Sequence, residues 1–153
     1  MWPFKAKQKT QAADAYSDYV DVDQFITAQQ LSPDEQDIVR RGLSAFAEHR
    51  LHPEIASDTL GAFSASALAI YAIDLAREAE SDTSLLQSAV SALEKAHSIY
   101  PHPMLLSHLA EVLDLARRPR DAESVRHQAE SLESQRARKA TDELLVSNLT
   151  FRL

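Results

Sequence analysis

Glycine scarcity is the feature that most constrains this chain, which has only 2 glycines among 153 residues. Glycine reaches positive φ angles at little cost, so a strand-rich fold with many tight hairpins would need more of it. Helices need few glycines, and Ala, Leu and Glu are among the commonest residues here. Neither Gly42 nor Gly61 has a second glycine nearby, so the sequence has no glycine-rich phosphate-binding loop. The composition therefore predicts an all-α fold, and the length is that of a single domain with one core.

Charge and cysteine content narrow the functional classes. The formal net charge is -7, which disfavours attraction to nucleic acid or to an anionic membrane. The chain has no Cys, which excludes disulfides, thiolate catalysis and Cys-based zinc sites. The longest apolar run, ALAIYAIDLA at 67–76, carries Asp74 and is shorter than the roughly 20 residues of a membrane span. No apolar segment typical of a secretory signal follows the lysine-bearing start, so we expect a cytoplasmic protein without nucleic-acid partners.

Apolar spacing and capping residues predict about six helices. The clearest start is SPDE at 32–35, whose serine and glutamate form a capping box around a first-turn proline. The segment 58–80 has apolar residues on nearly every face, so we expect it at the centre of the fold. Pro101 and Pro103 separate two further helices, because the residue before a proline avoids the α conformation. In order, the expected helices are 14–29, one beginning at Pro33, 58–80, 85–98, one beginning at Pro103, and 121–139.

The two ends of the chain differ from this helical body, which we assign to residues 13–140. Residues 1–12 are polar and aperiodic, and we expect them to be flexible. Within them, Trp2 and Phe4 stand beside lysines and would give at most a weak peripheral membrane contact. The tail 141–153 regains hydrophobicity, with alternating apolar residues at its end. This alternation predicts a short strand or an extended segment lying in a groove.

The stretch LLQSAVSALEKAHSIYP at 85–101 resembles the second helix of a tetratricopeptide repeat (TPR). In that family small residues stand where the helix approaches its partner, with a bulky residue between them and a closing proline. Two antiparallel helices at a short interaxial distance have no room for larger side chains at the crossing points. In this sequence the family positions are filled, at the family spacing, by Ala89, Leu93, Ala96 and Pro101.

The following stretch, 105–132, is similar to a further repeat. It departs from the family at Arg126, where a bulky apolar residue is preferred. The resemblance implies antiparallel helix pairs stacked in a right-handed superhelix. The residues that match the second repeat are Leu109, Ala110, Leu113, Ala122 and Ala129.

The TPR resemblance also implies a binding surface, because first-helix side chains line the concave face in that family. TPR proteins that clamp a C-terminal carboxylate carry lysine, arginine and asparagine there, whereas the matching positions in this chain are acidic or neutral. An acidic groove with an apolar floor suits a basic or amphipathic partner, either a helix or an extended segment. Carried onto this sequence, the partner-binding residues are Met104, Ser107, His108, Glu111 and Asp114.

No pattern typical of catalysis or metal binding stands out. The six histidines include no H-E-x-x-H motif and no carboxylate at a matching ligand spacing. Asp18, Asp21 and Asp23 lack the glycine and the final glutamate of an EF-hand loop. Asp74 is either a buried hydrogen-bonding group or a solvated residue close to Arg77. The sequence therefore predicts no catalytic residues, no metal and no cofactor.

These observations favour a non-enzymatic adaptor or scaffold that binds a protein or peptide partner. A small acidic chaperone is a close variant of that function. The alternative is a self-assembling structural protein whose tail docks into a neighbour's groove, which leaves a homodimer open. A small enzyme is the least favoured class, because no positioned nucleophile, base or metal set is visible.

Overall fold

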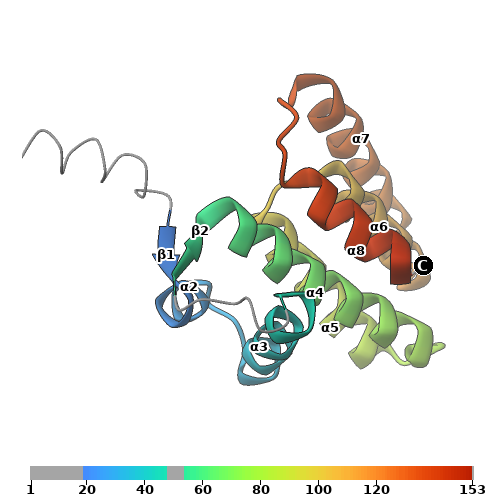
Figure 1. The fold of residues 1–153 in the computed structure, drawn as a ribbon. Coiled ribbons are helices and arrows are strands. Elements are labelled where there is room, and N and C mark those ends of the chain that lie inside the picture. The colour runs from blue at the N-terminus through green and yellow to red at the C-terminus, as the bar shows by residue number, and fades with distance from the viewer. Residues whose placement is uncertain (1–18, 48–53, 153) are drawn as a thin grey trace, which may run out of the picture.

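The computed structural model describes residues 19–47 and 54–152. Within these ranges the chain forms seven helices and one antiparallel pairing of two three-residue strands (Figure 1). The expected all-α character is thus confirmed, with the strand pairing as a small addition. The elements in chain order are β1 (Tyr19–Asp21), α2 (Val22–Ala28), α3 (Pro33–Ala47), β2 (Glu54–Ala56), α4 (Ser57–Ala79), α5 (Thr83–Ile99), α6 (Pro103–Leu115), α7 (Pro119–Gln135) and α8 (Asp142–Arg152).

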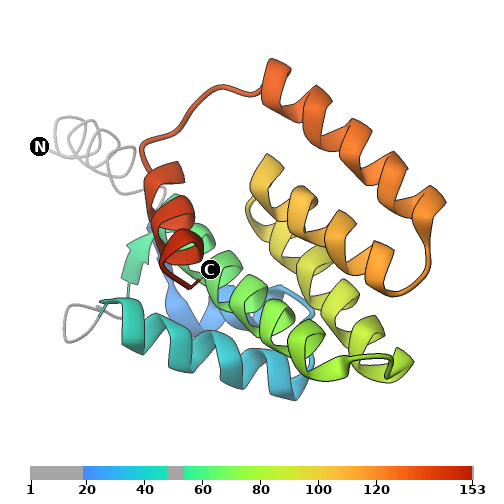
Figure 2. The same ribbon diagram turned by 90° about the vertical axis from the view of Figure 1, so that its right-hand side faces the viewer.

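Helix α4 is the centre of the fold, as its sequence predicts. It packs against α3, α5, α6 and α8, and nearly all side chains of residues 60–69 are buried. Helices α4 and α5 form one hairpin, α6 and α7 form a second, and α5 packs against α6 to join the two (Figure 2). A helix that other helices cover on several sides has to be apolar on nearly all of its faces. This packing explains why α4 carries so few charged residues.

Among the described helices, α4 is the one that is long and apolar enough to cross a membrane by length and composition. Most of its apolar stretch is buried inside the protein, and the core helix of a soluble protein passes the same test. Packing in the core therefore accounts for the composition of α4. The expected membrane contact through Trp2 and Phe4, in the segment 1–12, lies outside the described residues, as do His49 and His52.

The start of α3 has the predicted capping box. The Ser32 N–H donates to Glu35 Oε1 at 2.8 Å, and the Glu35 N–H donates to Ser32 Oγ at 3.1 Å. Lys95 Nζ of α5 also donates to Glu35 Oε1, at 2.5 Å, so the same carboxylate links α3 to α5. Burial alone would raise the pKa of Glu35, but the hydrogen bonds from Lys95 and Ser32 outweigh it and lower the pKa. Glu35 therefore stays ionised while it caps one helix and holds a second.

Within residues 19–47 and 54–152, three turns use residues other than glycine in the left-handed backbone region. The φ angles are 56° at Gln30, 51° at Glu80 and 60° at Arg117. Such a conformation costs an L-residue about 1 kcal/mol or more. Both glycines lie inside helices instead, Gly42 in α3 and Gly61 in α4. The scarcity of glycine that predicts helices thus also leaves the turns mildly strained.

The prediction for the C-terminal tail is wrong, because residues 142–152 form helix α8 and not a strand or an extended segment. Leu145 and Leu149, four residues apart, are both completely buried. That spacing places the two leucines on one face of a helix. The alternation at the very end of the chain covers too few residues to determine the conformation of the segment.

The first predicted helix, 14–29, is also corrected, since α2 begins at Val22 and residues 19–21 form β1. Val20 of β1 is paired with Ile55 of β2, so a distant segment holds this stretch extended. The Asp21 carboxylate accepts from the Gln24 N–H at 3.0 Å and caps the shortened helix. Residues 14–18 lie outside the described part of the chain. The last long helix, α7, ends at Gln135, earlier than predicted.

Candidate functional site

The five residues predicted to bind a partner all belong to α6. Ser107, Glu111 and Asp114 are exposed, and Met104 is half-buried against the core. These four residues form one continuous stripe, because positions three and four apart share a helix face. We call them the α6 surface. His108 differs from the other four in being buried, with 8% of the residue exposed.

The two carboxylates of the α6 surface differ in their partners. Asp114 forms an ion pair with Arg126 of α7, the residue that departs from the TPR pattern. The charge of Asp114 is therefore largely offset within the protein. Glu111 keeps 72% of its side chain exposed, and its Oε2 lies 3.7 Å from His108 Nδ1. Glu111 is thus the carboxylate of this surface that a basic partner would meet.

His108 lies beneath the α6 surface. Its Nε2 has no hydrogen-bond partner, and among the described residues the Ser64 hydroxyl on α4 is the other buried polar side-chain group in this state. An unpaired buried polar group costs about 1–3 kcal/mol. The resemblance placed His108 on a binding face, whereas in the structure its side chain is buried beneath the α6 surface.

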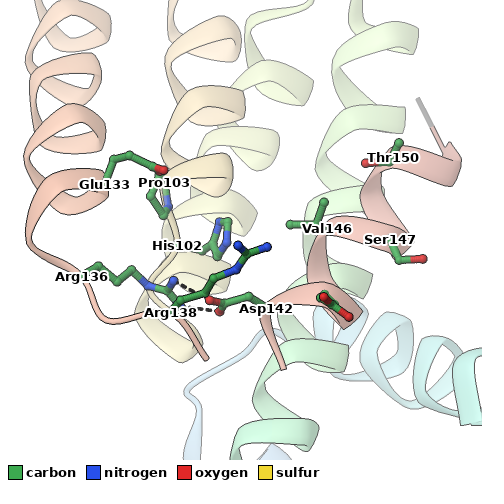
Figure 3. Close-up of a pocket in the computed structure, with 10 residues that line it drawn as sticks. His102, Pro103, Glu133, Arg136, Arg138, Asp142, Val146, Ser147 and Thr150 are labelled. Atoms are coloured by element: carbon green, nitrogen blue, oxygen red, sulfur yellow. Dashed lines mark hydrogen bonds and ion pairs between the residues drawn. The ribbon is translucent and has the colours of Figure 1, made fainter. Parts of the chain in front are cut away.

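An open cleft of about 980 Å³ begins at the N-terminal end of α6. Figure 3 shows His102 and Pro103 on one side of it, and Val146, Ser147 and Thr150 of α8 on the other. Pro103, the first residue of α6, is buried, and Ser107 lies about one helical turn beyond it, outside the lining of the cleft. Residues of both charges complete the lining, namely Glu133, Arg136, Arg138, Asp142 and Glu143.

A buried ion pair forms part of the lining of the cleft. Arg136 donates to Asp142 through both guanidinium nitrogens, Nη1 to Oδ2 at 2.8 Å and Nη2 to Oδ1 at 2.5 Å (Figure 3). The Tyr100 hydroxyl donates to Asp142 Oδ1 at 2.6 Å, and the Lys139 N–H donates to Oδ2 at 2.8 Å. Arg136 Nε also reaches the Pro101 carbonyl at 3.1 Å. The Arg136 guanidinium holds the pKa of Asp142 well below its usual range, so this carboxylate is ionised at every physiological pH.

Two histidines cap the junction between α5 and α6 beside this ion pair. His102 Nδ1 accepts from the Met104 N–H at 3.0 Å and is the N-cap of α6. His97 Nδ1 accepts from the His102 N–H at 3.2 Å. Each acceptor nitrogen must be unprotonated. Burial lowers the pKa of both histidines, and the positive charge of Arg136 lowers it further.

This arrangement predicts a loss of stability on mild acidification. Because the folded pKa lies below the ordinary value of about 6.5, the unfolded chain takes up these protons first as the pH falls. The stabilisation is complete above about pH 6.5 and is lost as the pH falls towards the folded pKa. In urea unfolding between about pH 8 and about pH 5, His102→Asn should lose less stability than wild type, because asparagine caps without titrating. The control is His127→Asn, a change at an exposed histidine of α7, which should lose as much stability as wild type. Equal losses in His102→Asn and His127→Asn would contradict this account.

The described residues include no group of three or more His, Cys, Asp or Glu side chains placed to hold a metal ion. Asp74, for which the sequence left two interpretations, is half-buried on α4. In the described part of the molecule, the Asp142 carboxylate accepts hydrogen bonds from both Tyr100 and Arg136.

Sequence reasoning missed the ion pair and the part that α8 plays in the cleft. Arg136 belongs to the basic stretch RARK, which the sequence explains equally well as an offset for neighbouring glutamates. A signal for α8 was present, because Thr141, Asp142 and Glu143 precede two leucines in the manner of a helix start. No sequence rule pairs Arg136 with Asp142 across a turn and with Tyr100 from another helix.

Comparison of the chain with models of protein families, with curated proteins and with solved structures finds no match.

Proposed function

We propose that this protein is a non-enzymatic protein-binding module that holds a segment of a partner protein along the α6 surface and in the adjoining cleft. The observation that carries the proposal is that the cleft and the α6 surface adjoin along one helix. Pro103 at the start of α6 lines the cleft, and the exposed residues Ser107 and Glu111 lie about one and two helical turns further along the same helix. A groove with one open end and a helix face beyond it can take an extended or helical segment.

A TPR-like arrangement is part of this proposal. Its support is the pair of consecutive hairpins, α4 with α5 and α6 with α7, joined through α5 and α6. The small residues that the family places at helix crossings are buried in both hairpins. These are Ala89, Ala96, Ala122 and Ala129.

The chemistry of the surface favours a basic, amphipathic partner segment. Glu111 offers an exposed negative charge, and Glu133 and Glu143 add two more in the cleft. Two large apolar side chains are exposed nearby, Leu115 at the end of α6 and Val146 of α8 in the cleft. Arg138 also lines the cleft, so the charge that meets the partner there is mixed. An adaptor and a small acidic chaperone both fit these features, and a chaperone would co-purify with one apolar client.

A photoreactive amino acid at Ser107 tests the proposal. Ser124, exposed on α7, is the matched control position. In extract of the native cell, the probe at Ser107 should form a discrete adduct with one protein, which mass spectrometry then identifies. The probe at Ser124 should form that adduct weakly or not at all. The same adducts from both positions, or none from Ser107, would contradict binding along α6.

A further inference from the structure

Helix α8 is held on the protein by one of its faces only. Leu145 and Leu149 are completely buried, and Asp142 is buried at the start of the helix. Asn148 Nδ2, on the same face, donates to Ser66 Oγ of α4 at 3.3 Å. The opposite face is exposed along its whole described length, at Glu143, Val146, Ser147 and Thr150.

The surface beneath α8 belongs mainly to α4. Ser66 is completely buried there and donates to the Ala62 carbonyl at 2.7 Å. Since α4 is apolar on nearly every face, its α8 side would present apolar surface to water if α8 left. An exposed apolar surface of this kind favours any occupant that covers it again. We call the α4 surface under α8, centred on Ser66, the α8 groove.

Helix α8 is attached to the rest of the chain by a short connection. It is joined to α7 through residues 137–140, all of which are exposed. An isolated helix of 11 residues is marginal in water, so α8 depends on the groove for its structure. Release of this terminal helix would break the Arg136–Asp142 ion pair, the hydrogen bonds of Tyr100 and Asn148, and the packing of its leucines, but would leave the rest of the core in place. An exchange of α8 between chains would need only this helix to leave, with α4 to α7 still folded.

We propose that two copies of this chain exchange α8, each inserting it into the α8 groove of the other to form a two-fold symmetric dimer. The second copy is the occupant whose fit is already known, because its α8 has the same sequence. Asp142 of the partner copy would meet Arg136 and Tyr100, and its Asn148 would meet Ser66, with the geometry found within one chain. Exchange of an identical element between protomers is a low-cost route to a dimer. This inference does not rest on the function proposed for the α6 surface.

The absence of cysteine allows a direct test. Two single variants, Ser66→Cys and Asn148→Cys, carry different affinity tags and are mixed at high concentration. A short bifunctional thiol reagent is then added. If α8 is exchanged, the yield of cross-linked heterodimer should be severalfold higher than in a control mixture of Ser66→Cys and Ser147→Cys. Ser147 is the control position because it lies on the exposed face of α8. The double variant Ser66→Cys/Asn148→Cys shows that the reagent spans the pair. Cross-linking in that double variant without excess heterodimer from the mixed singles overturns the proposal.

A shortened connection gives a second, independent readout. Deleting residues 137–140 prevents α8 from returning to the groove of its own chain. Light scattering should then give about twice the monomer mass of 17.0 kDa, with the amides of 142–152 still protected from hydrogen exchange. A shortened chain that stays monomeric with those amides unprotected overturns the proposal, whatever the cross-linking gives.

Discussion

Replacing Asp142 with alanine should lower the free energy of unfolding by about 3 kcal/mol and release α8 from α4. The substitution leaves Arg136, whose side chain is 13% exposed, without the carboxylate that binds both of its terminal nitrogens. The Tyr100 hydroxyl and the Lys139 N–H lose an acceptor as well. A buried charge without its partner costs more than the pair contributed, because its desolvation is no longer compensated. The loss is limited to the docking free energy of α8, since the rest of the core remains.

Glu143→Ala is the matched control for this prediction, because Glu143 is the next residue of the same helix turn and is exposed. It should change the free energy of unfolding by no more than about 0.5 kcal/mol. Hydrogen exchange separates local from global effects. Asp142→Ala should remove protection in residues 142–152 and leave α5 protected, whereas unchanged protection of 142–152 would show that the ion pair does not hold α8.

Replacing Ala89 with leucine should destabilise the fold by about 1–3 kcal/mol. Ala89 is completely buried on α5, which packs against α4 on one side and α6 on another. A larger side chain at this position has to push the helices apart or adopt a strained rotamer. The expected loss follows from close helix packing, which is the physical reason for alanine at this position of a TPR.

Ser88→Leu introduces the same side chain at the preceding, exposed position of α5 and controls for leucine itself. Its effect in urea unfolding should stay within about 0.5 kcal/mol. Equal losses from the two variants, or no loss from Ala89→Leu, would mean that α5 has free space at this position. The TPR-like part of the proposal would then lose its main structural support.

Those features that depend on neighbouring residues could be predicted from the sequence. The capping box can be predicted because Ser32 and Glu35 are only three positions apart in the sequence. The central position of α4 can be predicted because its residues are apolar on nearly every face. The strand β1 could not be predicted, because its conformation depends on pairing with β2 more than thirty residues away. Helix α8 could have been predicted from Thr141, Asp142 and the spacing of Leu145 and Leu149, but its docking on α4 could not, because it depends on residues distant in the sequence.

The candidate site likewise has a part that the sequence predicts and a part that it does not. The stripe of Met104, Ser107, Glu111 and Asp114 follows from helix geometry once α6 is recognised. The pairing of Asp114 with Arg126 and the burial of His108 depend on how α6 packs against other helices, which residue spacing does not specify. The surface that a partner would meet therefore carries less negative charge than the sequence implies.

Binding of the captured partner to Glu111→Lys, measured by titration calorimetry, tests the central claim most directly. Glu123→Lys on α7 is the control, since Glu123 is also an exposed acidic residue close to a histidine. Reversing the charge at Glu111 should weaken binding at least tenfold, a change of about 1.4 kcal/mol, while Glu123→Lys should stay within about twofold of wild type. Equal affinities for wild type, Glu111→Lys and Glu123→Lys would contradict binding on the α6 surface.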